Sequence, residues 1–300
     1  MGPLSGGRLV LFVAYFASRL TALLVLPVFL DEILHARWAR EIAEGRRSFA
    51  KTWEWGRALT VWLGALVTPF ATDLLWANRA LSVAAGALAL WATIETGRRL
   101  YDEKAGLLAG FFYVVCPFTL FYDRMALADA GLAACAAVAL LASVRAVQEG
   151  RLTQGALAGL ALVAAVLTKA PGVLLFGVPL GAALLLGSTR RGWRAIGAAY
   201  LVGAPPAAYA LWRFFATRNA ERMVDIATEN PAGPLGRLLS NLAEASGWLW
   251  TYWTAPLVVL GLLGLAASVR SRDRRGLLLF ALAVLPVVAF AALLSRWLPR

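Results

Sequence analysis

The 300-residue chain has few charged residues, a single histidine and only two cysteines. Charged residues make up 15% of it and hydrophobic residues 60%, and the mean hydropathy is +0.69. One core of this size cannot bury so much apolar surface, which excludes a soluble enzyme or a disordered regulator. Cys116 and Cys135 lie in apolar runs without metal-type spacing. They therefore suggest neither a disulfide framework nor a zinc site.

Acidic residues are also scarce. The chain has 17 Asp and Glu against 29 Lys and Arg, so its formal net charge is +12. In a soluble chain this excess would suggest nucleic acid, but no nucleic-acid motif, low-complexity tract or internal repeat is evident. In a membrane protein with several spans, basic loops instead reflect orientation and contact with anionic lipid.

Long apolar runs dominate the sequence. Several stretches of about 20 residues carry almost no charge, which predicts membrane-spanning helices. The first run exceeds the core of a signal peptide and lacks a small-residue cleavage site, so we expect it to be retained. The sequence thus predicts an all-α polytopic membrane protein with one domain over 1–300 and about nine spans, at 9–30, 78–97, 105–122, 126–147, 154–169, 170–187, 194–215, 246–269 and 276–295.

The apolar run 58–71 is different because it is too short to cross. Its roughly 14 residues reach about 21 Å, less than the ~30 Å hydrocarbon core. Pro69 also interrupts its end. We expect this segment to lie along the outer leaflet or to dip into it.

Arginine placement predicts the sidedness of the remaining runs. If 58–71 does not cross, four arginine-rich loops share one side, as the positive-inside rule expects of the cytoplasmic face. These loops are 98–104, 145–153, 188–194 and 270–275. The segments 31–77 and 216–245 then become outer loops. An aromatic belt near the outer interface would contain Trp38, Trp53, Trp55, Trp62, Trp76, Trp248, Trp250, Trp253 and Trp297.

Asp31 and Glu32 follow the first span directly and precede a predicted amphipathic helix at 36–45. Asp31 has two interpretations. As a helix N-cap, with Glu32 interacting with the helix dipole, it would contribute about 1 kcal/mol of stability. As a carboxylate at the membrane surface, it would act as a general base toward an acceptor hydroxyl or amine.

Further charged side chains lie in the other predicted outer turns. Each would cost roughly 2.5–3.5 kcal/mol toward the bilayer centre, so each needs a partner or water. We expect several of them to converge with Asp31 on one outward-facing cavity, in which cations bind an anionic head group. The acidic residues are Asp123 and Asp129, and the cations are Arg37, Arg57, Arg79, Arg124 and Lys169.

Other interpretations of single residues remain open at this point. Lys169 would also be explained by snorkelling to head groups, and Arg124 by a local pair with Asp123 or Asp129. Arg19 either pairs inside the bundle or snorkels. His35 fits an ordinary polar side chain better than a metal ligand. A divalent metal ion is a further candidate, and the carboxylates available to it are Asp31, Glu54 and Asp129.

With these residues in view, the chain resembles the GT-C membrane glycosyltransferases over nearly its whole length. The likeness is greatest to the protein O-mannosyltransferases and lipid A aminoarabinose transferases. The Asp31-Glu32 pair and its following helix resemble the family's first outer loop, and residues 78–82 resemble its R-x-x-S motif. Arg124 with Asp129 resembles the R-x-x-x-x-D turn, and 167–171 the T-K-G-x turn.

The chain departs from the family pattern at three places. His35 stands where the family usually has tyrosine. Residues 54–57 stand where the family has a lysine followed by prolines, so Arg57 or Lys51 would have to replace that lysine. The chain ends where relatives continue into further spans, so we expect the C-terminal part of the family to be absent.

The resemblance implies an inverting glycosyltransferase of a prokaryotic plasma membrane. It would move a sugar from a polyprenyl-phosphate donor to a lipid, protein or glycan acceptor at the outer face. From the short length of 58–71 and from Pro69, we expect that segment to line the donor entrance. The implied catalytic residues are Asp31, as the base, with Glu32 and Asp129. The implied donor-phosphate ligands are Lys169, Arg57, Arg79 and Arg124. The alternatives are a transporter or lipid flippase, whose charges usually lie near the midplane, and an inactive assembly factor.

Overall fold

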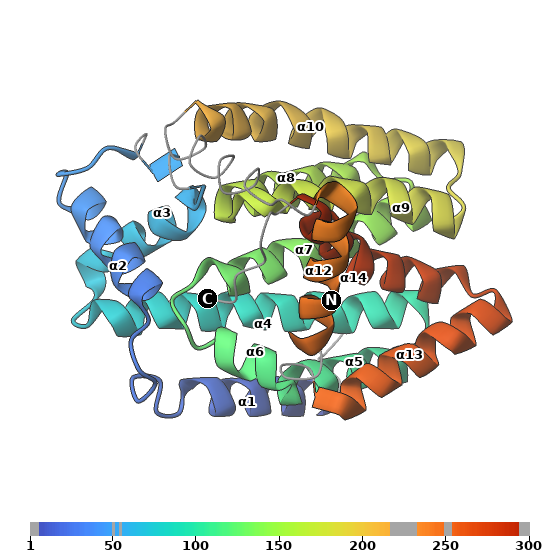
Figure 1. Cartoon of the computed structure of the whole chain (residues 1–300), viewed down its shortest axis with the longest axis horizontal. Helices are drawn as coiled ribbons and strands as arrows, with labels where there is room; N and C mark the ends of the chain where they lie inside the picture. Colours follow the sequence, from blue (N-terminus) through green and yellow to red (C-terminus); the bar gives the residue numbers. More distant parts are fainter. Residues whose placement is uncertain (1–5, 50–51, 54–55, 217–232, 249–253, 294–300) are drawn as a thin grey trace.

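The computed structural model describes residues 6–49, 52–53, 56–216, 233–248 and 254–293. In these residues every regular element is a helix, and the longer helices run back and forth along the long axis of the molecule (Figure 1). The first half of the chain forms α1 (Gly6–Leu20), α2 (Leu30–Ala43), α3 (Ala58–Val67), the short η2 (Thr68–Phe70), α4 (Leu74–Leu100), α5 (Glu103–Val115), α6 (Pro117–Tyr122) and α7 (Ala128–Glu149).

The second half continues the bundle. It forms α8 (Leu152–Thr168), η3 (Ala170–Phe176), α9 (Gly177–Leu186), α10 (Arg190–Phe215), α12 (Gly233–Trp248), α13 (Thr254–Ser271) and α14 (Arg274–Leu293). Small residues bring α8 and α10 close together, as is common between helices in membranes. A Cβ atom on Gly155 or Gly159 would overlap the backbone oxygen of Ala195 or Ala199.

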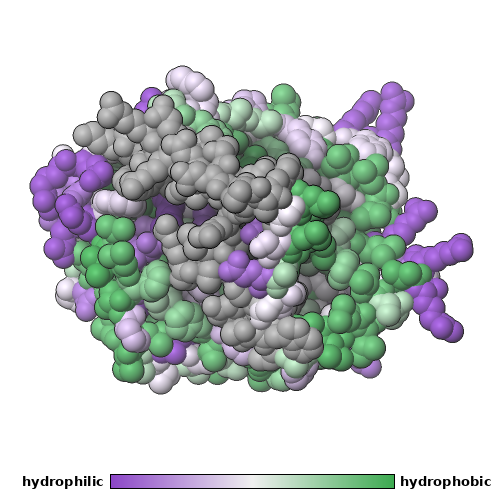
Figure 2. All heavy atoms as spheres, viewed as in Figure 1, coloured by the Kyte–Doolittle hydropathy of each residue, from purple (hydrophilic) through white to green (hydrophobic). Residues whose placement is uncertain are grey.

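The surface of the bundle fits a membrane environment. Figure 2 shows patches of hydrophobic side chains between the two ends of the long axis, where hydrophilic side chains gather. Two described helices, α4 and α7, are each long and apolar enough to cross a membrane. Shorter apolar helices extend over Ala58–Phe70, Leu152–Thr168, Ala170–Leu186 and Ala255–Ser271. The all-helical prediction is confirmed for the described residues, while the number of spans stays a prediction.

Several predicted helices are interrupted. The first run, 9–30, is helical only as far as Leu20, and Ala22 has a positive φ of 52°. The run 105–122 breaks between α5 and α6 because Pro117 has no N–H to continue the helix. The run 170–187 begins as η3, with proline near its start. The run 246–269 includes the end of α12 and most of α13, and residues 249–253 between them lie outside the described residues.

The arginine-rich loops gather at one end of the bundle, opposite α2 and α3 (Figure 1). An ion pair of 2.7 Å between Arg99 and Glu149 connects two of them, and Arg8 of α1 lies 2.7 Å from Glu95 near the end of α4. Tyr101 donates to Asp273 at 2.7 Å. Which side of the membrane this end faces stays a prediction.

The α2–α3 pair occupies the other end. The ten residues of α3 extend only about 15 Å, so α3 does not cross a ~30 Å hydrocarbon core. It packs against α2 through a small cluster of Ala39, Ile42, Val61 and Ala65. The helices α2 and α3 therefore form a cap at this end of the bundle (Figure 1), and the position of 58–71 in the outer leaflet stays a prediction.

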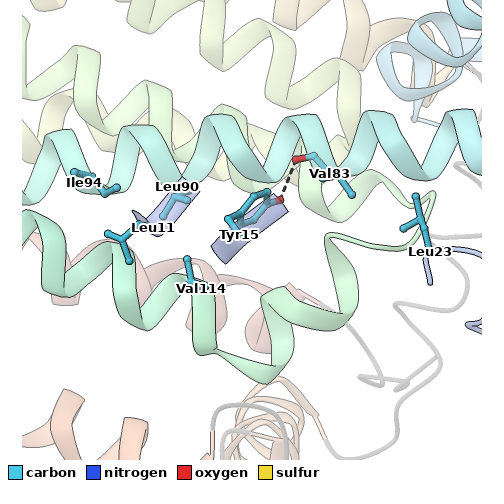
Figure 3. Packing of buried hydrophobic residues seen from close by; sticks show 7 residues of the cluster. All are labelled: Leu11, Tyr15, Leu23, Val83, Leu90, Ile94 and Val114. Atoms are coloured by element: carbon cyan, nitrogen blue, oxygen red, sulfur yellow. Dashed lines mark hydrogen bonds between the residues drawn. The ribbon is translucent and has the colours of Figure 1, made fainter. Parts of the chain in front are cut away.

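A buried cluster fixes α1 against α4 and α5, as Figure 3 shows. Tyr15 lies at its centre and donates from its hydroxyl to the backbone oxygen of Val83 at 2.9 Å. The cluster also contains Leu11, Leu23, Leu90, Ile94 and Val114. It holds the end of α1 beside α4, so the chain leaves α1 at the end of the bundle where α2 begins.

Arg19 is fully buried and pairs inside the bundle instead of snorkelling. Its Nη1 atom donates to the backbone oxygen of Val114 at 2.7 Å, and its Nη2 atom donates to Thr119 Oγ1 at 3.2 Å. The Nε atom lies 3.9 Å from Asp123 Oδ2. These partners lie on either side of the α5–α6 break, so Arg19 stabilises a kink that the apolar pattern hides.

Candidate active site

The residue at which α2 begins determines which partners Asp31 and Glu32 contact. The N-cap residue is Phe29, and its N–H donates to Glu32 Oε2 at 2.9 Å. The prediction that Asp31 is the N-cap is therefore wrong, because the helix begins before it, at Leu30. Glu32 instead accepts the hydrogen bond from the N-cap N–H, and the Asp31 side chain is left to contact Arg57.

Glu32 forms a fully buried ion pair with Arg79 of α4, at 2.8 Å. Its Oε1 atom accepts from Arg79 Nε at 2.8 Å and from the Ala126 N–H at 2.7 Å. Its Oε2 atom accepts from Arg79 Nη2 at 2.8 Å as well as from Phe29. Burial acts to raise the pKa of Glu32, but these donors, Arg79 above all, hold it below its ordinary value.

Arg79 also ties the irregular connection between α1 and α2 to α4. It donates to the backbone oxygens of Leu23 at 2.8 Å, Leu26 at 3.1 Å and Pro27 at 3.1 Å. These carbonyls follow the end of α1 and lack helical partners. Arg79 is thus surrounded by acceptors of the protein itself, away from the exposed surface.

Arg124 has a related position in the turn between α6 and α7. Its Nη2 atom donates to the backbone oxygens of Thr21 and Ala22, both at 2.9 Å. Arg124 thus binds backbone atoms of the α1–α2 connection instead of forming the expected local pair with Asp123 or Asp129. Glu32, Arg79 and Arg124 together form a frame that joins α2, α4, the α1–α2 connection and the α6–α7 turn.

Asp31, Arg57 and His35 form a second cluster, which shares α2 with this frame. Arg57, just before α3, places its Nη1 atom 3.0 Å from Asp31 Oδ2 and 3.0 Å from His35 Nε2. His35 Nδ1 lies 2.9 Å from the backbone oxygen of Ala126. The side chains of Asp31 and Arg57 are 19% and 25% exposed, whereas His35 is buried.

A second carboxylate–cation pair lies on neighbouring elements. Lys169, between α8 and η3, donates from Nζ to Asp129 Oδ1 at 2.8 Å, and Asp129 lies in the first turn of α7. Both side chains are about one-third exposed. Lys169 therefore pairs with a carboxylate rather than only snorkelling.

The two pairs are adjacent. Asp129 is close enough to His35 for its negative charge to act on the pKa of that ring. Gly56, with φ +61°, brings the chain before Arg57 against Ala170, the neighbour of Lys169. A Cβ atom there would lie 3.3 Å from that of Ala170 and 3.2 Å from the Phe214 ring. The structure thus gathers Asp31, Arg57, Asp129 and Lys169 at one end of the bundle.

Arg37 lies elsewhere. It is on the outward face of α2, 2.8 Å from Glu41 Oε1. There it lines a shallow cavity of about 390 Å³ together with Arg40, Arg46 and the start of α4. Arg37 was expected to lie with Arg57 and Lys169 in one cavity, and this prediction is wrong.

No described group of three His, Cys, Asp or Glu side chains has a metal-binding arrangement. Asp31 and Asp129 each face a cation, and Glu54 lies outside the described residues. A divalent metal ion at these carboxylates therefore stays a prediction.

His35 was expected to be an ordinary polar side chain and was not predicted to contact Asp31 or Arg57. The available signal was its spacing, because residues i and i+4 of a helix share a face and Asp31 and His35 have that spacing.

Comparison with known proteins agrees with the fold. The sequence model of the dolichyl-phosphate-mannose-protein mannosyltransferase family matches residues 58–212, more than half of the chain. Its match contains Arg79, Arg124, Asp129 and Lys169 and begins just after Arg57. No curated protein matches the chain significantly. The chain therefore belongs to the dolichyl-phosphate-mannose-protein mannosyltransferase family of the GT-C superfamily, as the motif resemblance predicted.

Proposed function

We propose that this membrane glycosyltransferase takes a sugar from a polyprenyl-phosphate donor and transfers it to a hydroxyl or amine acceptor at the outer face of a prokaryotic plasma membrane. Family membership supports the reaction class. The observation that carries the proposal is the pair of partly exposed carboxylate–cation contacts, Asp31–Arg57 and Asp129–Lys169, at one end of the bundle.

Each part of the site has a task in a single displacement. The acceptor oxygen or nitrogen attacks the anomeric carbon, and the bond from that carbon to the phosphate oxygen breaks. The acceptor proton passes to the Asp31 carboxylate, which acts as the general base. The leaving group is polyprenyl phosphate, whose charge is stabilised by Arg57 and Lys169. Attack opposite the departing phosphate inverts the anomeric centre.

Before the donor binds, Arg57 is paired with Asp31 and Lys169 is paired with Asp129. A phosphate offers stronger, charge-assisted acceptors, so the guanidinium and the ammonium group exchange partners when it arrives. Partial exposure of all four side chains keeps the cost of this exchange low, because water solvates the charges that separate. Arrival of the donor then frees Asp31 to accept the proton.

The buried residues support this machinery without touching the substrates. Glu32 was expected to be catalytic, and Arg79 and Arg124 to bind phosphate. Because Glu32 and Arg79 are fully buried against each other, and Arg124 binds backbone carbonyls, we assign all three a positioning role. Asp129 holds Lys169 until the phosphate arrives.

The outward orientation is supported by charge. The end opposite the site contains the arginine-rich loops, which the positive-inside rule assigns to the cytoplasm. The site would then face outside. A transporter or flippase is less well supported, because its coupling charges would lie near the midplane of repeated halves.

Transfer of radiolabelled mannose from a polyprenyl-phosphate donor by the purified protein tests the proposal. Asp31→Asn should lower the rate by about 10²–10⁴-fold, because the amide cannot accept the proton. Asp73→Asn is the matched control. Asp73 caps α4 by accepting from the Trp76 N–H, and asparagine caps equally well. A wild-type rate in Asp31→Asn would refute the base, and transfer only from a nucleotide sugar would refute the donor.

A further inference from the structure

His35 lies at the centre of the candidate site but has no task in the displacement. Its ring is buried between the Ala126 carbonyl oxygen, 2.9 Å from Nδ1, and the Arg57 guanidinium, 3.0 Å from Nε2. The Trp38 ring lies 6.1 Å away, centroid to centroid. Both ring nitrogens therefore have protein partners.

These partners determine the proton positions of the ring. A carbonyl oxygen only accepts hydrogen bonds, so Nδ1 carries a hydrogen. A guanidinium group only donates, so Nε2 presents its lone pair. The contacts are thus satisfied by a neutral ring with its hydrogen on Nδ1, and by no other protonation state.

We propose that His35 is a positioning residue of the glycosyl-transfer site, which holds Arg57 beside Asp31 by accepting a hydrogen bond from its guanidinium while the Ala126 carbonyl fixes the ring. This inference rests on the proposed function. Its consequence is that Arg57 starts each cycle at a defined place, from which it reaches the donor phosphate while keeping one contact with the protein. A charged group stabilises a departing phosphate effectively only when it is held in the correct position.

Protonation of the ring would remove this hold. A hydrogen on Nε2 would face the Nη1 hydrogens of Arg57, so that two donors and two positive charges meet at 3.0 Å. The charged groups around the ring are Arg57 before α3, Asp31 on α2 and Asp129 on α7. Burial of the ring is the largest cause that lowers the pKa of His35. The Ala126 carbonyl opposes this shift, Arg57 adds to it, and the two carboxylates oppose it.

The direction of the pH dependence follows. Because the pKa of His35 lies below its ordinary value, the ring stays neutral at pH 7 and the hold on Arg57 is complete. It is lost as the pH falls through the lowered value. Donor binding should therefore weaken on acidification, as the ring of His35 takes up a proton.

Nitrogen-15 NMR of the histidine-labelled protein tests the tautomer directly, since the chain contains a single histidine. At pH 7 the expected spectrum has a protonated Nδ1 and an unprotonated Nε2. Arg57→Met should shift the Nε2 signal and leave Nδ1 nearly unchanged. A ring protonated on both nitrogens, a hydrogen on Nε2, or an Nε2 signal indifferent to Arg57→Met would each overturn the inference.

Two substitutions separate the contacts of the ring. In His35→Asn the amide N–H takes the place of Nδ1 and keeps the bond to Ala126, but nothing reaches Arg57. In His35→Gln the amide oxygen takes the place of Nε2 and keeps the bond to Arg57. We expect His35→Asn to raise the KM for the donor roughly ten-fold with a smaller effect on kcat, the loss of about one charge-assisted hydrogen bond.

His35→Gln should keep a donor KM near that of the wild type and should lose the weakening at acidic pH. Equal donor KM values in the two variants, or an unchanged acidic limb in His35→Gln, would overturn the inference. If the wild type transfers no sugar but shows the neutral Nδ1–H ring that responds to Arg57→Met, the proposed function fails and the hold of His35 on Arg57 stands.

Discussion

Glu32→Gln should destabilise the protein strongly although it changes only one atom. Each oxygen of the Glu32 carboxylate accepts from one Arg79 nitrogen and one backbone N–H. Whichever way the amide of glutamine is turned, its NH2 group faces two donors. The substitution also leaves the fully buried Arg79 charge without its partner.

The expected loss is large for a single site. Removing one partner of a buried ion pair costs about 3–5 kcal/mol. For a chain of 300 residues, whose unfolding entropy is about 0.63 kcal/mol/K, that lowers Tm by roughly 5–8 °C. The pH dependence has the same origin. Because the pKa of Glu32 lies below its ordinary value, its contribution is complete above about pH 5 and is lost as the pH falls through the lowered value.

Thermal unfolding of the purified protein in detergent measures this loss. Glu41→Gln is the matched control, because Glu41 lies on the same helix and pairs near the surface with Arg37 and Arg47, which are 69% and 26% exposed. This substitution should cost less than about 1 kcal/mol. Adding Arg79→Met to Glu32→Gln should restore part of the stability, since no buried charge then lacks a partner. A Tm of Glu32→Gln within about 2 °C of the wild type would refute this account of the frame.

Three further results are expected. Lys169→Met keeps the apolar stem but removes the charge, so donor KM should rise and kcat should fall, and unchanged kinetics would mean that the contact with Asp129 is only structural. Gly56→Ala adds a Cβ at positive φ against an aromatic ring and should cost about 1–3 kcal/mol by thermal unfolding, whereas an unchanged Tm would contradict the close packing there. In a background without native cysteines, an impermeant thiol reagent should label Ser48→Cys quickly and Arg190→Cys hardly at all from outside, and rapid labelling at 190 would overturn the proposed sidedness.

The helices that the sequence located best are those whose ends have local signals. The run 126–147 became Ala128–Glu149, which ends at Gly150 in a left-handed conformation, a common helix stop. The run 9–30 was too long because apolar composition reports burial or lipid contact and not helicity. Residues 21–29 are apolar but largely irregular, and the partners that hold them, Arg79 and Arg124, come from far along the chain.

The site was predictable to a similar degree. The residue types and their outer turns identified Asp31, Asp129 and Lys169, since unpaired charges among apolar runs demand partners. Because Asp31 and Glu32 are adjacent, the sequence did not show that Asp31 would be partly exposed beside Arg57 and Glu32 fully buried against Arg79. This difference depends on where α2 begins and on Arg79 and Ala126, which lie 47 and 94 residues away. The contact between His35 and Arg57 likewise depends on the packing of α2 against the chain before α3.

The central claim is that Arg57 and Lys169 leave their carboxylates to bind the donor phosphate. The structure of the protein with a polyprenyl phosphate bound tests it most directly. We expect the phosphate within hydrogen-bond distance of both cations, with Asp31 released from its 3.0 Å contact with Arg57. A phosphate bound at the arginine-rich end, or beside Arg37 and Arg40 with both carboxylate–cation pairs intact, would contradict the account.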